Sequence, residues 1–238
     1  MKFGLARLGN TLYDLAPRIY RPFYSAYKSV SDRRERALFR SWLKPGMVVL
    51  DIGANIGVYT RFFARLVGNG GKVFAFEPEK RNLMYLKAST EDLGQVEVVD
   101  AAVLDRNGAL KLFVSPDLNV DHRTYDAGDD RTIVEVRAVA IDDFLPVDVR
   151  VNAIKMDIQG SELGALRGAR RLLEASQRFL VIFEYWPYGI VRAGDRPENV
   201  IEFLASRGFS VATVKGGPVP DLDPAQINDY VNLVATKG

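Results

Sequence analysis

The chain has 238 residues, of which 47% are hydrophobic and 26% are charged, and these values are typical of a globular protein rather than a disordered or fibrous one. It contains no cysteine and a single histidine, His122, which excludes disulfides, zinc–thiolate sites, thiol nucleophiles and any site that needs two histidines. The net charge of +2 is too balanced for a dedicated nucleic-acid-binding protein, so no nucleic-acid partner is expected.

The charges are unevenly distributed along the chain. Residues 1–44 carry ten basic and three acidic side chains, whereas the rest of the chain has a net charge of −5. Two X-Pro steps, at Pro17 and Pro22, predict that short helices end there. A further helix is expected from Ser31 or Asp32 up to the Lys-Pro-Gly turn that follows.

We interpret residues 1–44 as a basic helical extension that caps a core domain at 45–238. A lid over the substrate, or a patch that makes weak peripheral contact with an anionic membrane, is the alternative for this extension. Its aromatic and basic composition also leaves open an exchange between subunits of a homo-oligomer.

The sequence lacks the usual signals of export and membrane insertion. Arg7 and Asn10 interrupt the apolar residues near the N-terminus, so these residues do not form a signal-peptide core. No later run approaches the roughly 20 apolar residues that span a bilayer. We therefore expect a cytoplasmic protein.

From residue 47 onward, short apolar runs alternate with helical segments. Strands are predicted at 47–52, 72–76, 96–99, 153–157 and 179–184, and helices at 58–67, 78–93, 161–173 and 197–206. Two β-type runs, at 109–114 and 132–139, interrupt the alternation, and the last two runs, at 209–214 and 230–235, are expected to pair antiparallel. Repeated βαβ units predict an α/β domain with a mostly parallel sheet covered on both faces.

The strongest local signal is the run Asp51-Ile-Gly-Ala-Asn-Ile-Gly between the first strand and the first helix. Its glycines allow a close approach of a ligand to the backbone, and the following helix presents free N–H groups. A dinucleotide fingerprint would need glycines where this chain has Asn55 and Val58, which argues against a nicotinamide oxidoreductase. A carboxylate and an amide suit the amino-acid moiety of S-adenosylmethionine (SAM). The candidate ligands in this loop are Asp51, Gly53, Ala54, Asn55 and Gly57.

Two further strand ends contribute candidates for the same cofactor. Glu77 ends the second strand and is followed by Pro78, and a carboxylate at this place accepts the hydroxyl groups of a ribose. Capping of the following helix is the alternative role for Glu77. Asp100 and Ala101 follow the third strand and are assigned to the adenine end of the site, although a turn role fits Asp100 as well.

With these motifs the sequence resembles the FkbM family of SAM-dependent methyltransferases. The matching segments lie at 49–57, 73–78, 154–162 and 166–169, so the resemblance covers roughly residues 45–186. It implies a class I methyltransferase (Rossmann-like) fold, a seven-stranded sheet with an antiparallel last strand, and O-methylation of hydroxyl groups on sugars or natural products. The family usually has glutamate where this chain has Gln159.

Three residues are candidates for removing the proton of an acceptor. The sulfonium of SAM activates the methyl group, so the protein must mainly align the acceptor and take up its proton. Asp157 follows the fourth strand, Glu184 lies near the end of the fifth, and His122 lies in the polar loop between the two β-type runs. Asp157 is the first candidate, either as the base or as an anchor, with helix capping as the alternative. His122 has a suitable ordinary pKa, although a lone histidine is often structural.

Residues near these positions are candidates for binding the acceptor. The polar loop offers hydrogen-bonding groups and a cation for an anionic acceptor, and an aromatic side chain follows the fifth strand. Glu162 alternatively stabilises the first turn of its helix. These candidates are Asn119, Arg123, Tyr125, Glu162 and Trp186.

A divalent metal and other activities remain as alternatives. Asp157, Glu184 and His122 offer oxygen and imidazole ligands, but their spacing is too loose to assign a metal, so none is favoured. We expect an O-methyltransferase acting on a small molecule or saccharide. An N-methyltransferase, an RNA methyltransferase and a non-catalytic scaffold that keeps the cofactor site are the alternatives.

Overall fold

The computed structural model describes residues 17–116, 120–126 and 128–238. The predicted acceptor-binding residue Asn119 lies outside the described residues, as does the first part of the basic extension.

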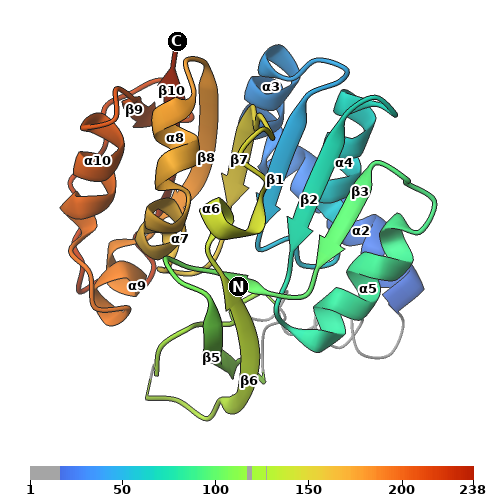
Figure 1. The fold of residues 1–238 in the computed structure, drawn as a ribbon. Coiled ribbons are helices and arrows are strands. Elements are labelled where there is room, and N and C mark those ends of the chain that lie inside the picture. The colour runs from blue at the N-terminus through green and yellow to red at the C-terminus, as the bar shows by residue number, and fades with distance from the viewer. Residues whose placement is uncertain (1–16, 117–119, 127) are drawn as a thin grey trace.

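A seven-stranded sheet forms the centre of the molecule, with strand order β3-β2-β1-β7-β8-β10-β9 (Figure 1). Every neighbouring pair from β3 to β8 is parallel, and β10 is antiparallel to both β8 and β9. This is the predicted fold class, including the antiparallel last strand. The strands are β1 Val48–Ile52, β2 Lys72–Phe76, β3 Val96–Val99, β7 Ala153–Met156, β8 Phe179–Tyr185, β9 Ser210–Thr213 and β10 Val231–Lys237.

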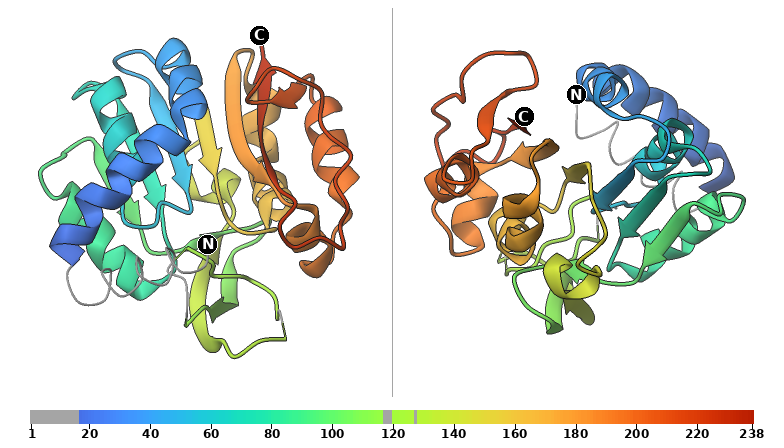
Figure 2. Two further views of the ribbon diagram at one scale, coloured as in Figure 1. Left: turned by 180° about the vertical axis from the view of Figure 1, so that it is seen from behind. Right: turned by 45° about the horizontal axis from the view of Figure 1, so that its top comes forward.

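Helices cover both faces of the sheet because successive strand residues point to opposite sides and both sides are apolar. In β1, Val49 packs with the residues of α3 and α4, whereas Leu50 packs in the cluster that includes α7 and α10. Seen from behind, α2 and α3 lie in front of the sheet, on the face opposite α6, α7 and α8 (Figure 2). The helices are α2 Pro17–Ser31, α3 Arg33–Trp42, α4 Val58–Val67, α5 Lys80–Thr90, α6 Ile141–Phe144, α7 Glu162–Gly168, α8 Arg170–Ala175, α9 Pro187–Arg192 and α10 Pro197–Ala205.

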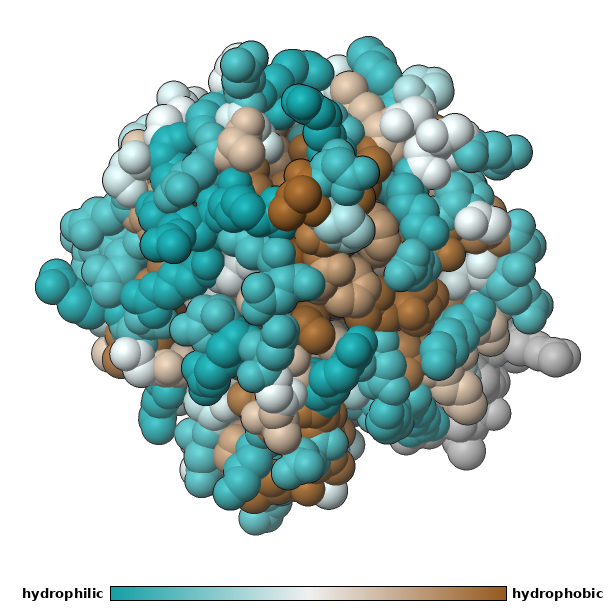
Figure 3. Space-filling model, in the orientation of Figure 1, coloured by the Kyte–Doolittle hydropathy of each residue, from teal (hydrophilic) through white to brown (hydrophobic). Residues whose placement is uncertain are grey.

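A small second sheet projects from the carboxyl edge of the main sheet (Figure 1). It consists of β4 Ala102–Val103, β5 Gly108–Val114 and β6 Thr132–Val139, in the order β4-β6-β5. The two β-type runs predicted from the sequence form its antiparallel pair. Polar side chains cover much of the face in Figure 3, and apolar side chains gather at this projecting sheet, where Ile133 is 55% exposed.

The part of the extension that forms α3 packs into the core of the molecule. Phe39 of α3 is fully buried and Leu43 is 3% exposed, and both join the cluster formed by α4 and the sheet. The ring of Phe39 meets that of Phe63 edge to face, with the centroids 4.7 Å apart. Among the described helices, none combines the length and the apolar character needed to cross a bilayer.

Several helix boundaries differ from the predictions, and the helix predicted at 78–93 is the shorter α5, because Glu79 rather than Pro78 begins it as the N-cap. The helix α2 runs through Pro22 instead of ending there, so the loss of one helical hydrogen bond at this proline is tolerated. An ion pair between Lys28 and Asp32 at 3.0 Å connects the end of α2 to the start of α3. The single helix predicted at 161–173 is divided into α7 and α8. The carboxylate of Asp142 accepts the N–H groups of Arg171 and Leu172 and so caps a new helix start.

Candidate active site

The loops that follow β1 and β7 lie in direct contact at the carboxyl edge of the sheet. Gly53 has a φ of 78°, and a Cβ added there would lie 2.2 Å from the carbonyl oxygen of Asp157. Gly57 has a φ of 87°, and a Cβ there would lie 2.5 Å from the hydroxyl of Ser89. Both positions therefore require glycine for conformation and for space. The N–H groups of Gly53 and Ala54 donate to the carbonyl of Phe76, which fixes the loop against β2.

Asp51 places a buried carboxylate under this loop. Its side chain is fully buried, and Oδ2 accepts a hydrogen bond from the hydroxyl of Thr60 at 2.6 Å. Its Oδ1 atom has no hydrogen-bond partner among the described residues. Burial raises the pKa of Asp51 above its usual range. A buried carboxylate oxygen without a donor is costly, so this atom suits a donor supplied by a ligand.

Asn55 and Glu77 connect the glycine loop to the end of β2. Asn55 has a left-handed backbone with a φ of 50°, and its side-chain oxygen accepts the N–H of Ile56 at 2.8 Å. Its own N–H donates to Oε2 of Glu77 at 2.8 Å. Glu77 is 4% exposed, and burial raises its pKa to about 7.

The helix-capping alternative for Glu77 is wrong, because the next carboxylate caps α5. Glu79 accepts hydrogen bonds from the N–H groups of Arg81 and Asn82. Oε1 of Glu77 instead accepts the N–H of Glu79 at 3.0 Å. Glu77 therefore shapes the turn between β2 and α5 and faces the loop after β1.

The remaining predicted cofactor residues lie at the same edge of the sheet. Pro78 is half-buried directly after Glu77, and Ala101 is fully buried after β3. Asp100 is paired with Lys80 at 2.6 Å, and both side chains are exposed. Such a surface pair contributes little to stability. A role of Asp100 and Ala101 at the adenine stays a prediction.

Asp157 and Glu184 are brought together by one side chain that the sequence analysis did not place in the site. The Nε2 atom of Gln159 donates to Oδ1 of Asp157 at 3.0 Å and to Oε1 of Glu184 at 2.9 Å. Asp157 directly follows β7, and Glu184 lies near the end of the adjacent parallel strand β8, which explains why they meet at this edge.

Two lysines face the same carboxylates. Lys155 belongs to β7, is 13% exposed, and lies 3.5 Å from Oδ2 of Asp157. Lys28 comes from α2 and lies within electrostatic reach of Asp157. Tyr59 connects these groups, because the ammonium of Lys155 lies 5.2 Å from its ring centroid and its hydroxyl donates to Asp32, the partner of Lys28.

These surroundings push the two carboxyl pKa values in opposite directions. Burial raises the pKa of Glu184 well above its usual range, and the charges of Asp157 and Glu162 add to this effect. Burial also opposes ionisation of Asp157, but Lys155 and Lys28 outweigh it and hold the pKa of that carboxyl below its usual range. Asp157 is therefore ionised at neutral pH, while Glu184 keeps a higher proton affinity.

Glu162 shapes the loop after β7. Its side chain is fully buried, and its two oxygens accept the N–H groups of Ile158 and Gly160 at 3.2 and 3.0 Å. Burial raises its pKa to about 7. We therefore expect Glu162 to support the loop that carries Gln159, and contact with an acceptor stays a prediction.

Asp121 joins two buried arginines in the polar loop. Arg123 binds both oxygens of Asp121, at 2.8 and 3.0 Å, and Arg131 donates to the same carboxylate at 2.8 Å. The side chains of Arg123 and Arg131 are 6% and 4% exposed. The predicted binding of an anionic acceptor by Arg123 stays a prediction, and the structure adds a role in holding the loop together.

Trp186 and Tyr125 pack around Arg123. The guanidinium of Arg123 lies 5.0 Å from the ring of Trp186 and 5.8 Å from that of Tyr125. Trp186 is 5% exposed and donates its indole N–H to the carbonyl of Ile227 at 2.9 Å. The ring is thus used in internal packing, and the predicted contact of Trp186 with an acceptor stays a prediction. Tyr125 is buried, and its hydroxyl has no hydrogen-bond partner among the described residues.

The polar loop also contacts the start of α7. The hydroxyl groups of Thr124 and Ser161 lie 2.5 Å apart. The Nδ1 atom of His122 accepts the N–H of Ser115 at 3.2 Å, within the same loop. The structure thus brings Asp157 and Glu184 together, whereas a catalytic role of His122 stays a prediction.

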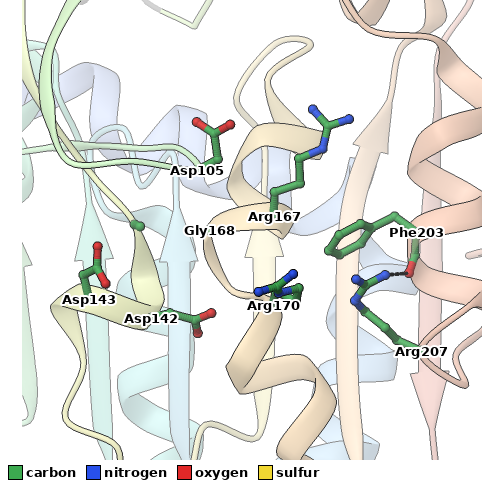
Figure 4. Close-up of a pocket in the computed structure, with 9 residues that line it drawn as sticks. Asp105, Asp142, Asp143, Arg167, Gly168, Arg170, Phe203 and Arg207 are labelled. Carbon is green, nitrogen blue, oxygen red and sulfur yellow. Dashed lines mark hydrogen bonds between the residues drawn. The ribbon is translucent and has the colours of Figure 1, made fainter.

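A cavity of about 480 Å³ lies elsewhere, between α6, α7 and α10 (Figure 4). Three aspartates and three arginines line it: Asp105, Asp142, Asp143, Arg167, Arg170 and Arg207. Asp142 caps α8, and Arg207 donates to the carbonyl of Phe203, so part of this charge already serves the fold. Within the described part of the chain, no group of three or more histidine, aspartate or glutamate side chains is arranged to hold a metal ion.

Comparison with known proteins shows which family the chain belongs to. The family model of the methyltransferase FkbM domain matches residues 51–211, which include both loops of the site. The chain belongs to the FkbM methyltransferase family. This FkbM methyltransferase is 28% identical to the 2-O-methyltransferase NoeI of Sinorhizobium fredii over 148 residues, which cover 55% of this chain and 60% of NoeI. The chain thus spans about 60% of the length of this curated relative.

Solved structures show the same fold. A proposed rRNA methylase from Clostridium thermocellum has a TM-score of 0.52 at 17% identity, over 85% of this chain and 94% of that one. Fibrillarin of Aeropyrum pernix, solved with natively bound SAM, has a TM-score of 0.50 at 12% identity, over 86% and 74% of the two chains. At these identities the likeness shows the fold alone.

The chain belongs to a methyltransferase family, and SAM is the cofactor expected of it. The residues present fit this cofactor: Asp51 offers a buried oxygen without a donor among the described residues, and the left-handed turn of Gly53 and Asn55 follows directly after it. When bound, SAM supplies a methyl group on a positively charged sulfur. Asp51, Asn55 and Glu77 are the residues that we expect to hold it.

Sequence reasoning missed Lys28, Tyr59, Lys155 and Gln159 as members of the site. A lysine inside the otherwise apolar strand Ala153–Met156 was a usable signal, because buried strands exclude unpaired charges. The position of Lys28 depends on how α2 packs, and no local pattern predicts it.

Proposed function

We propose that this FkbM methyltransferase transfers the methyl group of SAM to a hydroxyl group of a small molecule or saccharide. The observation that carries the proposal is the pair of carboxylates, Asp157 and Glu184, joined by Gln159 directly beside the loop of Gly53. Its relative NoeI is a 2-O-methyltransferase, which supports transfer to oxygen.

An acceptor hydroxyl must lose its proton as its oxygen gains the methyl group. The raised pKa of Glu184 gives its carboxylate a higher proton affinity than an ordinary carboxylate has, which favours it as the proton acceptor. The lowered pKa of Asp157 keeps this carboxylate charged, so it can accept a hydrogen bond from the acceptor without taking its proton. When the pKa values of two neighbouring carboxyl groups shift in opposite directions, one group can exchange a proton while the other stays charged. We assign the proton to Glu184 and the orientation of the acceptor to Asp157.

The experiment is transfer of labelled methyl from SAM to a panel of saccharide, phenolic, amine and RNA acceptors. With a hydroxyl acceptor, Glu184→Gln should lower turnover by about 10²–10⁴-fold. Binding of S-adenosylhomocysteine by calorimetry should change little in this variant. Transfer only to amines or RNA, or cofactor binding without any transfer, would contradict the proposal.

His122→Ala serves as the matched comparison. If Glu184 takes the proton, this variant keeps most of its turnover, whereas a loss equal to that of Glu184→Gln would move the role to His122. The cytoplasmic location, the boundary at residue 44, the membrane contact and the homo-oligomer also stay predictions.

A further inference from the structure

We propose that Gln159 is a positioning residue, which holds Asp157 and Glu184 together as a neutral bridge in the place that a cation would otherwise fill. The proposal rests on the proposed function only where Glu184 is taken as the proton acceptor. The bridge itself is a property of the three side chains and is independent of the acceptor.

The geometry determines which end of the amide faces the carboxylates. Both partners of the Gln159 side chain are carboxylate oxygens, at 3.0 and 2.9 Å. A carboxylate accepts hydrogen bonds, and an amide carries two N–H groups on its nitrogen. The nitrogen therefore lies between the two acidic groups and gives one N–H to each.

The backbone aims this side chain at the two carboxylates. Gln159 has a φ of 54°, a left-handed conformation that an L-residue adopts at a cost of about 1–2 kcal/mol. Glu162 holds the loop through the N–H groups on both sides of Gln159, those of Ile158 and Gly160. A Cβ at Gly160 would lie 2.4 Å from the backbone of Gly189, so only glycine lets this turn pack directly against α9. Such strain persists where the surroundings hold it.

The charges around the bridge explain why a neutral donor suits this position. Acidic and phenolic groups from several elements lie within electrostatic reach of Asp157 or Glu184, and two ammonium groups oppose them. The acidic and phenolic groups are Asp51, Asp157, Glu162, Glu184 and Tyr230, and the ammonium groups are Lys28 and Lys155. A further carboxylate at 159 would place three carboxyl groups together and remove the amide donor that now joins two of them. Three neighbouring carboxyl groups must either share protons or bind a cation that prefers oxygen ligands.

The first test measures the carboxyl groups directly, without an acceptor. Carboxyl ¹³C NMR titrations of protein with bound S-adenosylhomocysteine would follow Asp157 and Glu184, with assignments from Asp157→Asn and Glu184→Gln. In Gln159→Met the lost donor should raise the pKa of Asp157 by about 1 unit. In Gln159→Glu an additional carboxyl should titrate near or above neutral pH. The exposed Gln177→Glu is the matched control and should change neither titration.

The second test uses Mn²⁺ as the probe, followed by electron paramagnetic resonance. The variant Gln159→Glu should bind Mn²⁺ at least about tenfold more tightly than the wild-type protein, because it completes a set of carboxylate ligands. The double variant with Asp157→Asn should lose this gain. The proposed bridge would be contradicted if wild type and Gln159→Glu bound Mn²⁺ with equal affinity. It would also be contradicted if a folded Gln159→Met left both carboxyl titrations unchanged. Failure to methylate a hydroxyl would refute only the proposed function and leave both results standing.

Discussion

The carboxylate of Glu77 accepts the backbone N–H of Asn55 at 2.8 Å, so the end of β2 holds the cofactor loop that follows β1. The same carboxylate accepts the N–H of Glu79 with its other oxygen. A residue predicted from the sequence as a ribose ligand therefore also fixes the backbone of the loop beside it.

Replacing Glu77 by alanine should weaken both cofactor binding and the fold. The N–H groups of Asn55 and Glu79 would lose their acceptor, at about 1–3 kcal/mol for each group that stays buried and unpaired. Calorimetry with S-adenosylhomocysteine and urea unfolding would measure the two effects. Glu97→Ala, on an exposed side chain of β3, is the control. Unchanged affinity in Glu77→Ala would remove Glu77 from the cofactor site.

The ligand-free protein should become less stable as the pH rises from about 4.5 to 7. Burial raises the pKa of Glu162 to about 7, whereas the same group titrates near 4.5 when unfolded. Between these values the folded protein binds more protons than the unfolded chain, so a rising pH favours unfolding. Melting temperatures at pH 5 and 7.5 would show the fall. It should be smaller in Glu162→Gln and unchanged in the exposed variant Glu202→Gln, and an equal fall in all three proteins would contradict the assignment.

Gly53→Ala should disrupt the contact between the two loops of the site. The left-handed backbone alone costs an alanine about 1–2 kcal/mol, and its Cβ would meet the carbonyl of Asp157 at 2.2 Å. We expect a lower melting temperature and a loss of affinity for S-adenosylhomocysteine. Gly94 has open space around it, so Gly94→Ala is the matched control. Full affinity in Gly53→Ala would show that the loop tolerates a side chain.

Asp121→Asn should destabilise the protein by about 3–5 kcal/mol, because it removes the charge that two buried arginines share. Asp129 also pairs with Arg131, but it is 48% exposed. Asp129→Asn should therefore change the free energy of unfolding by less than about 1 kcal/mol. Urea unfolding of both variants would make the comparison. Similar losses in the two variants would show that burial does not set the strength of these pairs.

The sequence by itself determined the parts of this protein that depend on local pattern. The strand Lys72–Phe76 and the helix Val58–Val67 are predicted to the residue, because apolar periodicity and turn residues act over a few neighbours. The run from Asp51 to Gly57 predicted the cofactor loop, and its Gly53, Asn55 and Gly57 have the left-handed backbone that such a tight turn requires.

Only the tertiary structure decided which side chains meet. The indole N–H of Trp186 donates to the carbonyl of Ile227, and the guanidinium of Arg123 lies over its ring, so the side chain is used inside the protein. Lys28 lies within electrostatic reach of Asp157 on the helix α2, which continues through Pro22 although the sequence predicts a helix end there. Gln159 bridges two carboxylates that are 27 residues apart in the sequence and neighbours only across β7 and β8. Such contacts arise from packing between distant segments, which local propensity does not encode.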